Sequence, residues 1–220
     1  MADYEYVYST NYDLLLYWSM MTDREKFKDF IWTRDIDEGK CFFDLADTDL
    51  WHDPRNSVTK VLYIHGGLHL YKQPDGRTFK KLASGNCDLL DLFDVKNDAI
   101  PLFISEGTSK TKLSSISRSD YLSFAYGRFA RHRGSLVVFG HSLTSEYDQH
   151  LIDAIRKWKR YDQKRMKFQQ VPERRVIAIS VLPQSDSHTI IQFKSRLGRE
   201  LGDYNVRFFD AKTNPFANVE

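Results

Sequence analysis

Short, uninterrupted apolar runs recur along this chain, and most of them do not alternate between apolar and polar positions. Runs of this kind are typical of strands that are covered on both faces, as in a parallel sheet. Seven such strands are predicted, at residues 4–9, 40–45, 61–65, 100–105, 135–140, 176–182 and 206–211. The pattern therefore favours a sheet that lies between layers of helices.

Between these runs, apolar residues recur at the spacing of a helix face. Helices are predicted at residues 11–21, 118–132, 145–163 and 186–201. The second has an apolar face of Tyr121, Leu122, Ala125 and Phe129, and the third one of Leu151, Ile152, Ile155 and Trp158. Ser145 and Asp148 stand three apart, as in a capping box, which places the start of the third helix. The alternation predicts an α/β fold, doubly wound with a mostly parallel sheet.

The length of the chain fits a single domain over residues 1–220. Residues 72–97, between the third and fourth predicted strands, are polar, irregular and glycine-containing. We expect this stretch to be a surface excursion or a lid.

Composition limits the classes of partner and the compartment. The net charge of +2 gives no general attraction to nucleic acid or to anionic membranes. No apolar run approaches the roughly 18 residues that cross a bilayer, and the first residues lack the pattern of a signal peptide. Two cysteines cannot build a disulfide framework or a four-thiolate zinc site. A cytoplasmic protein without a metal is expected.

Polar residues follow four of the predicted strands. In open α/β sheets ligands bind outside the carboxyl ends of the strands, so these segments predict a shared cleft. They are residues 9–13, 65–67, 105–109 and 140–143.

Taken in order along the chain, these segments resemble the sirtuin-like family. The resemblance is to its bacterial branch, which contains NAD-cleaving defence enzymes, and to a related bacterial family of unknown function. The matching residues are Thr10, Asn11 and Asp13 in a T-N-Y-D motif, His65 and Gly66 in a His-Gly motif, and Gly140, His141, Ser142 and Leu143 in a G-H-S-L motif.

The chain departs from the family in two ways. The first strand of the family, with the Gly-rich loop that holds the NAD phosphates, is missing, which predicts a domain truncated at its N-terminus. The four-cysteine zinc module is also absent, so protein deacetylation is not expected. A missing strand would leave a sheet edge open, which predicts association with a second copy or with a partner protein.

The resemblance implies an NAD glycohydrolase that releases nicotinamide and ADP-ribose, in an anti-phage defence role. NAD would be the substrate or ligand, and the partner a small nucleotide. His65 would act as the general base, since the pKa of histidine lies near neutrality, and Asn11 and Asp13 would complete the catalytic group. The nucleotide would be bound by Thr10, Asn11, Asp13, Gly66, Gly140, Ser142 and Leu143.

Each motif also has a structural interpretation. Asn11 and Asp13 are residue types that cap helices, and His65 can be a core histidine ahead of a tight glycine turn. Ser142 can be a turn residue, and His69 is expected to pack or to support the lid. The alternative functions are a non-catalytic module that binds NAD or ADP-ribose, and an interaction protein with a degenerate pocket.

Overall fold

The computed structural model describes residues 2–34, 40–50, 58–81, 98–165, 175–183 and 186–213, without the side chains of residues 49–50 and 158–165. The chain divides into two compact units, Met1–Phe129 (unit 1) and Ala130–Glu220 (unit 2), which we describe separately. The prediction of one domain over residues 1–220 stays a prediction.

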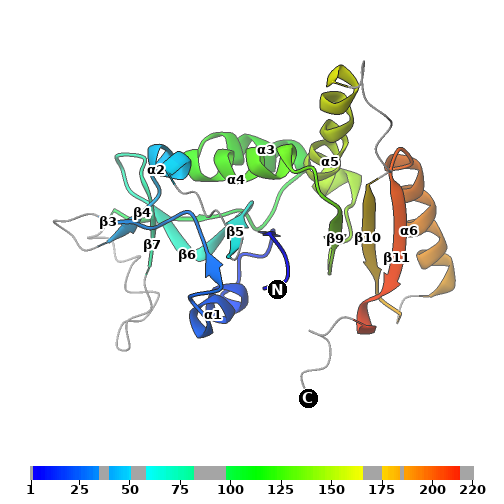
Figure 1. The fold of residues 1–220 in the computed structure, drawn as a ribbon, viewed down its shortest axis with the longest axis horizontal. Helices are drawn as coiled ribbons and strands as arrows, with labels where there is room; N and C mark the ends of the chain where they lie inside the picture. Colours follow the sequence, from blue (N-terminus) through cyan, green and yellow to red (C-terminus); the bar gives the residue numbers. More distant parts are fainter. Residues whose placement is uncertain are drawn as a thin grey trace. The chain divides into compact units, whose positions relative to one another are not determined.

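Unit 1 contains a parallel and an antiparallel sheet (Figure 1). The parallel sheet has the order β1-β5-β2, with β1 at Tyr6–Ser9, β5 at Thr59–Tyr63 and β2 at Phe27–Lys28. The antiparallel sheet has the order β3-β4-β7-β6-β8, with β3 at Thr33–Arg34, β4 at Cys41–Phe42, β7 at Thr78–Lys80, β6 at Gly66–Lys72 and β8 at Ile100–Phe103. The helices of this unit are α1 at Leu15–Thr22, α2 at Leu45–Leu50, α3 at Ser109–Ser117 and α4 at Asp120–Arg131, whose last two residues are the first of unit 2.

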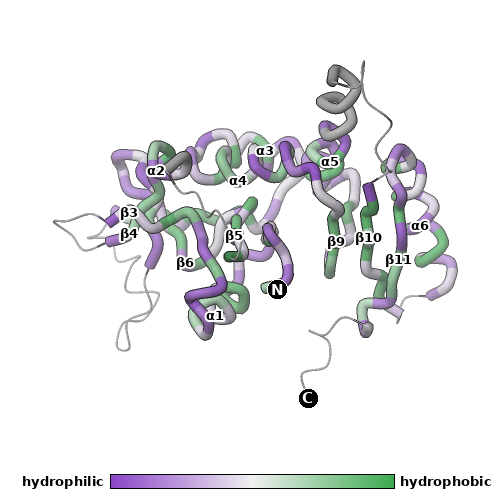
Figure 2. Tube along the Cα trace, in the orientation of Figure 1, coloured by the Kyte–Doolittle hydropathy of each residue, from purple (hydrophilic) through white to green (hydrophobic). Residues whose placement is uncertain are grey.

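Unit 2 contains a parallel sheet with the order β11-β10-β9. Its elements are β9 at Leu136–Val138, α5 at Ser145–Arg165, β10 at Val176–Val181, α6 at Ser187–Glu200, β11 at Asn205–Asp210 and a 3₁₀ turn at Ala211–Thr213. Strands β9 and β10 are mostly hydrophobic in Figure 2, as their sequence pattern requires. Helix α6 packs on this sheet, where the rings of Phe193 and Phe208 meet edge to face at 6.2 Å.

The α/β class is confirmed, and all seven predicted strand regions contain a strand. Their arrangement differs from a single doubly wound sheet, because the described parallel pairing falls in two three-stranded sheets. The strand predicted at residues 100–105 pairs antiparallel with β6. The strand predicted at 40–45 is only two residues long, because the Asp44 carboxylate accepts from the amide of Ala46 and helix α2 begins.

Strand β6 was not predicted, and it changes the role of the segment that follows. The chain turns at Ile64 and His65, and β6 begins directly after this turn, at Gly66. Strands β6 and β7 form a hairpin, so the described start of the predicted excursion, up to residue 81, belongs to the antiparallel sheet. Residues 82–97 of that prediction lie outside the described residues.

The predicted helix faces are confirmed where their side chains are described. Tyr121, Leu122, Ala125 and Phe129 of α4 are buried, and so are Leu151, Ile152 and Ile155 of α5. The side chain of Trp158 lies outside the described residues. Tyr121 also accepts a hydrogen bond at its hydroxyl from the amide of Tyr63, 3.1 Å away, which ties α4 to strand β5.

Candidate functional site

The loop at residues 9–13 runs beside the turn that follows β5. Ser9 pairs with Tyr63 in the parallel sheet, and beyond this pair the amide of Ile64 donates to the carbonyl of Ser9 at 2.8 Å. Further along, the amide of Leu68 donates to the carbonyl of Tyr12, also at 2.8 Å. The backbone itself therefore brings the T-N-Y-D and His-Gly motifs together.

The end of the strand predicted at residues 100–105 also lies beside these two motifs, through a strand pairing that the sequence did not predict. Because β8 is antiparallel to β6, with Phe103 opposite Gly66, strand β8 ends beside the turn that follows β5. The amide of Ile104 donates to the carbonyl of His65 at 2.8 Å, and the rings of Tyr12 and Phe103 stack at 5.4 Å. Residues 105–108, which follow, are exposed.

The side chains of Asn11 and Asp13 contact each other. The Asn11 amide Nδ2 donates to Oδ2 of Asp13 at 3.3 Å, while Oδ1 of Asp13 accepts from the amide of Leu15 at 3.0 Å. Asp13 therefore serves the start of α1 and orients the Asn11 carboxamide at the same time. Asn11 is exposed and Thr10 is half-buried, so this motif presents polar groups at the surface.

His65 lies in the tight turn between β5 and β6, and Gly66 is the first residue of β6. Gly66 has φ +74°, and a Cβ atom there would lie 2.1 Å from the carbonyl oxygen of Leu102. The backbone packing of β8 thus explains this glycine without a ligand. His65 is only 3% exposed, so a ligand can reach its imidazole only if the side chains that cover it move.

His69 is a buried histidine below the same turn. Its ring stacks on Tyr17 and meets Tyr63 edge to face, each with 4.6 Å between ring centroids. Neither ring nitrogen has a hydrogen-bond partner among the described residues. The ring packs against Gly67, where an added Cβ atom would lie only 2.9 Å from Cε1 of His69. Burial, assisted by the positive charge of Lys80, lowers the pKa of His69 to about 3. The expected packing role is confirmed, and the imidazole stays neutral at physiological pH.

In unit 2, the G-H-S-L motif forms most of a loop at residues 140–144, and three amides of this loop donate to side chains of the same unit. Gly140, at φ +65°, donates its amide proton to Oγ of Ser180 at 3.0 Å. The amide of Leu143 donates to Nδ1 of His141 at 3.0 Å, and the amide of Thr144 donates to Oδ2 of Asp148 at 3.3 Å. Phosphate binding through these three amides would require these bonds to be given up.

Two features of this loop were not expected. Leu143 was a predicted binding residue, but its side chain is 2% exposed and packs in the core. The predicted capping pair is shifted by one residue, because the Asp148 carboxylate accepts hydrogen bonds from the amide and hydroxyl of Thr144 and not from Ser145. Ser142 remains exposed and is the predicted binding residue whose side chain this loop offers to solvent.

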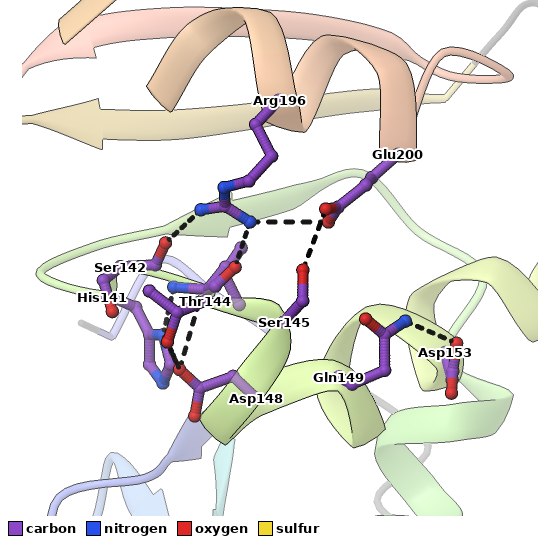
Figure 3. Close-up of polar contacts among 10 residues, drawn as sticks. His141, Ser142, Thr144, Ser145, Asp148, Gln149, Asp153, Arg196 and Glu200 are labelled. Atoms are coloured by element: carbon purple, nitrogen blue, oxygen red, sulfur yellow. Dashed lines mark hydrogen bonds and ion pairs between the residues drawn. The ribbon is translucent and has the colours of Figure 1, made fainter. Parts of the chain in front are cut away.

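Helix α6 supplies a contact to the loop that no motif pointed to (Figure 3). Arg196 donates from Nη2 to the carbonyl of Ser142 at 2.9 Å and from Nη1 to the carbonyl of Leu143 at 2.5 Å. Leu143 has φ +47°, a conformation that costs a non-glycine residue about 1–2 kcal/mol, while a hydrogen bond to a charged group is worth about 1.5–3 kcal/mol. Two such bonds are enough to hold Leu143 in this conformation.

The described residues contain no cluster of three His, Cys, Asp or Glu side chains able to hold a metal ion. Within the same residues, no helix is both long and apolar enough to cross a membrane. The expected absence of a metal stays a prediction.

Comparison with known proteins gives a family and no function. The model of a domain of unknown function, DUF4917, matches residues 1–216, nearly the whole chain. No curated protein matches this sequence. The resemblance to the sirtuin-like family stays a prediction, and the chain belongs to the DUF4917 family.

Proposed function

We propose that this protein binds NAD and hydrolyses it to nicotinamide and ADP-ribose. The observation that supports the proposal is the meeting of three strand ends in unit 1, through the bonds from Ile64 to Ser9 and from Ile104 to His65. These bonds bring the backbone at His65 beside the loop that carries Asn11 and Asp13, the residue types that the resemblance assigns to catalysis.

The reaction would break the bond between the ribose C1 and the nicotinamide nitrogen through an oxocarbenium-like state. Asn11 would orient the attacking water, with its carboxamide held by the 3.3 Å bond to Asp13. His65 would accept a proton from this water or from a ribose hydroxyl, and such base catalysis is typically worth about 10²–10⁴ in rate. The Asp13 carboxylate would favour the positive charge that develops on the ribose.

In unit 2, we propose the 140–144 loop as the nucleotide-binding element. Since the amides of Gly140, Leu143 and Thr144 already have partners, recognition would rest on the exposed hydroxyl of Ser142. Its ligand would be a ribose hydroxyl or a phosphate oxygen of a nucleotide.

The second candidate is a module that binds NAD or ADP-ribose without turnover. The 3% exposure of His65 favours it, because a general base must reach the proton that it accepts. Binding without chemistry would need only the polar groups at the surface.

Nicotinamide release by the purified full chain, supplied with NAD or with NADP, tests the proposal. We expect turnover in the wild type and a loss of at least about 100-fold in His65→Ala and Asn11→Ala. His188→Ala and Gln192→Ala are matched controls on α6, where both side chains are exposed, and should keep full activity.

Calorimetry with ADP-ribose separates the two candidates. Binding together with turnover supports the hydrolase, and binding alone supports the non-catalytic module. A wild-type protein that neither binds nor cleaves these nucleotides would reject both candidates. Turnover that survives in His65→Ala and Asn11→Ala would reject the hydrolase with these catalytic residues. A role in anti-phage defence predicts that the His65→Ala strain loses protection in a phage plating assay.

A further inference from the structure

Arg196 and Glu200 of α6 form one network with the loop and with the first turn of α5. Arg196 donates to the carbonyls of Ser142 and Leu143, and its Nη1 lies 3.4 Å from Oε2 of Glu200. The other carboxylate oxygen of Glu200 accepts from the hydroxyl of Ser145 at 3.0 Å. Figure 3 shows both α6 side chains directed at this loop.

The guanidinium group recognises one particular backbone shape. Leu143 adopts φ +47°, and its amide is turned toward Nδ1 of His141. In this shape the consecutive carbonyls of Ser142 and Leu143 both accept from Arg196. The planar fork of arginine can donate to two acceptors at once, which a lysine ammonium on its flexible stem does far less well.

We propose that Arg196 is a positioning residue for nucleotide binding, which holds the 140–144 loop so that the Ser142 hydroxyl faces the ligand. This inference rests on the proposed function of that loop. Arg196 itself need not touch the nucleotide, because it acts through three bonds, to the carbonyls of Ser142 and Leu143 and to Glu200.

The attachment of α6 does not depend on Arg196, so its role in the loop can be tested separately. Leu197 is fully buried, and Phe193 packs on Phe208 of β11. The carboxylate of Asp186 caps the helix by accepting from the amide of Thr189 at 2.8 Å. Loss of the guanidinium group should therefore release the loop and leave the helix in place.

The test compares Arg196→Met, which keeps much of the aliphatic stem, with Arg196→Lys and with Arg199→Met. Arg199 lies on the same helix and is exposed, which makes it a matched control. With ADP-ribose as the probe, we expect binding about 10-fold weaker in Arg196→Met, an intermediate loss in Arg196→Lys and no change in Arg199→Met.

Hydrogen exchange makes the test independent of the proposed function. The amides of Leu143 and Thr144 should lose protection in Arg196→Met and keep it in Arg199→Met, while the amides of α6 stay protected. Unchanged protection of the loop would overturn the inference, even if the wild type bound no nucleotide. Loss of protection with unchanged ADP-ribose affinity would also overturn it. If Arg196→Met does not fold, the same comparison is made with Arg196→Lys.

Discussion

The two groups of motif residues are held in place by different means. In unit 1, the 9–13 loop is joined to the segment after β5 by backbone bonds, from Ile64 to Ser9 and from Leu68 to Tyr12, and its side-chain bonds are local ones. In unit 2, the 140–144 loop is fixed largely by side chains. Ser180, for example, accepts a hydrogen bond from a loop amide, and Arg196 donates to a loop carbonyl. Backbone bonds survive most substitutions, whereas each side-chain bond is lost with one residue.

This difference has a consequence for how mutations act in each unit. In unit 1, side chains such as Asn11 can change while the path of the loop stays fixed, so their replacement should alter chemistry more than structure. In unit 2, removal of a residue that is remote in sequence should change the shape of the loop. The predictions below start with the largest expected effect.

The largest effect is expected for Gly66→Ala. Its Cβ atom would lie 2.1 Å from the carbonyl oxygen of Leu102, and φ is +74°, so the turn and β8 must separate. We expect unit 1 to lose about 3 kcal/mol or more of unfolding free energy. Gly140→Ala is the matched control in unit 2, since φ is +65° there but no atom lies within 4 Å of its Cβ, and it should cost only about 1–2 kcal/mol.

Urea unfolding, combined with hydrogen exchange that resolves the two units, measures both variants. Equal losses of unfolding free energy in Gly66→Ala and Gly140→Ala would contradict the close backbone approach in unit 1.

Acid should weaken unit 1 through His69. Its pKa is about 3 in the folded protein against about 6.5 in the unfolded chain, so the unfolded state takes up the proton first as the pH falls. Stability is therefore present above pH 6.5 and is lost progressively down to pH 3. This histidine should account for a loss of about 2 kcal/mol between pH 8 and pH 5.

Replacement of His69 by Phe keeps an aromatic ring between Tyr17 and Tyr63 and removes both unpaired nitrogens. The variant should be at least as stable as the wild type at pH 8, and its stability should fall less at pH 5. His188→Gln, on the exposed start of α6, should keep the wild-type pH dependence. A pH dependence in His69→Phe equal to that of the wild type would show that another group carries it.

The smallest effects on stability are expected at two serines, each of which accepts a hydrogen bond from one backbone amide. Ser180 accepts from Gly140 and is 7% exposed, whereas Ser9 accepts from Asn11, where water can replace it. We expect Ser180→Ala to cost about 1 kcal/mol and Ser9→Ala about 0.3 kcal/mol. Hydrogen exchange of the Gly140 and Asn11 amides provides the measurement, and a larger effect for Ser9 would reverse the comparison between the two loops.

The sequence predicted elements well where a local pattern decides them. The face of α4 from Tyr121 to Phe129 follows from its spacing, and Asp186 caps α6 as its residue type favours. The meeting of Asn11 with the turn at His65 follows from parallel strands that end at one edge. These features depend on residues close in sequence or on a general rule of sheets.

The features that were missed depend on distant residues. Strand β6 begins at a glycine pair that reads as a turn, and only the backbone of Leu102 explains why Gly66 is required. Arg196 stands 53 residues beyond Leu143, and no periodicity links a helix arginine to two loop carbonyls. The capping pair was placed one residue late because Ser145 is a good cap by type, whereas its hydroxyl is used by Glu200.

The register of strand β6 determines its backbone bonds to both sheets of unit 1. Its pairing with β8 shifts between Gly66 and Tyr71, and within this interval the amide of Leu68 bonds to Tyr12 while the carbonyl of His69 accepts from Lys81. Successive strand residues point to opposite faces. Deleting one residue here would turn the imidazole of His69 outward and misalign the T-N-Y-D loop in the same step, so this short segment should tolerate changes of side chain far better than changes of length.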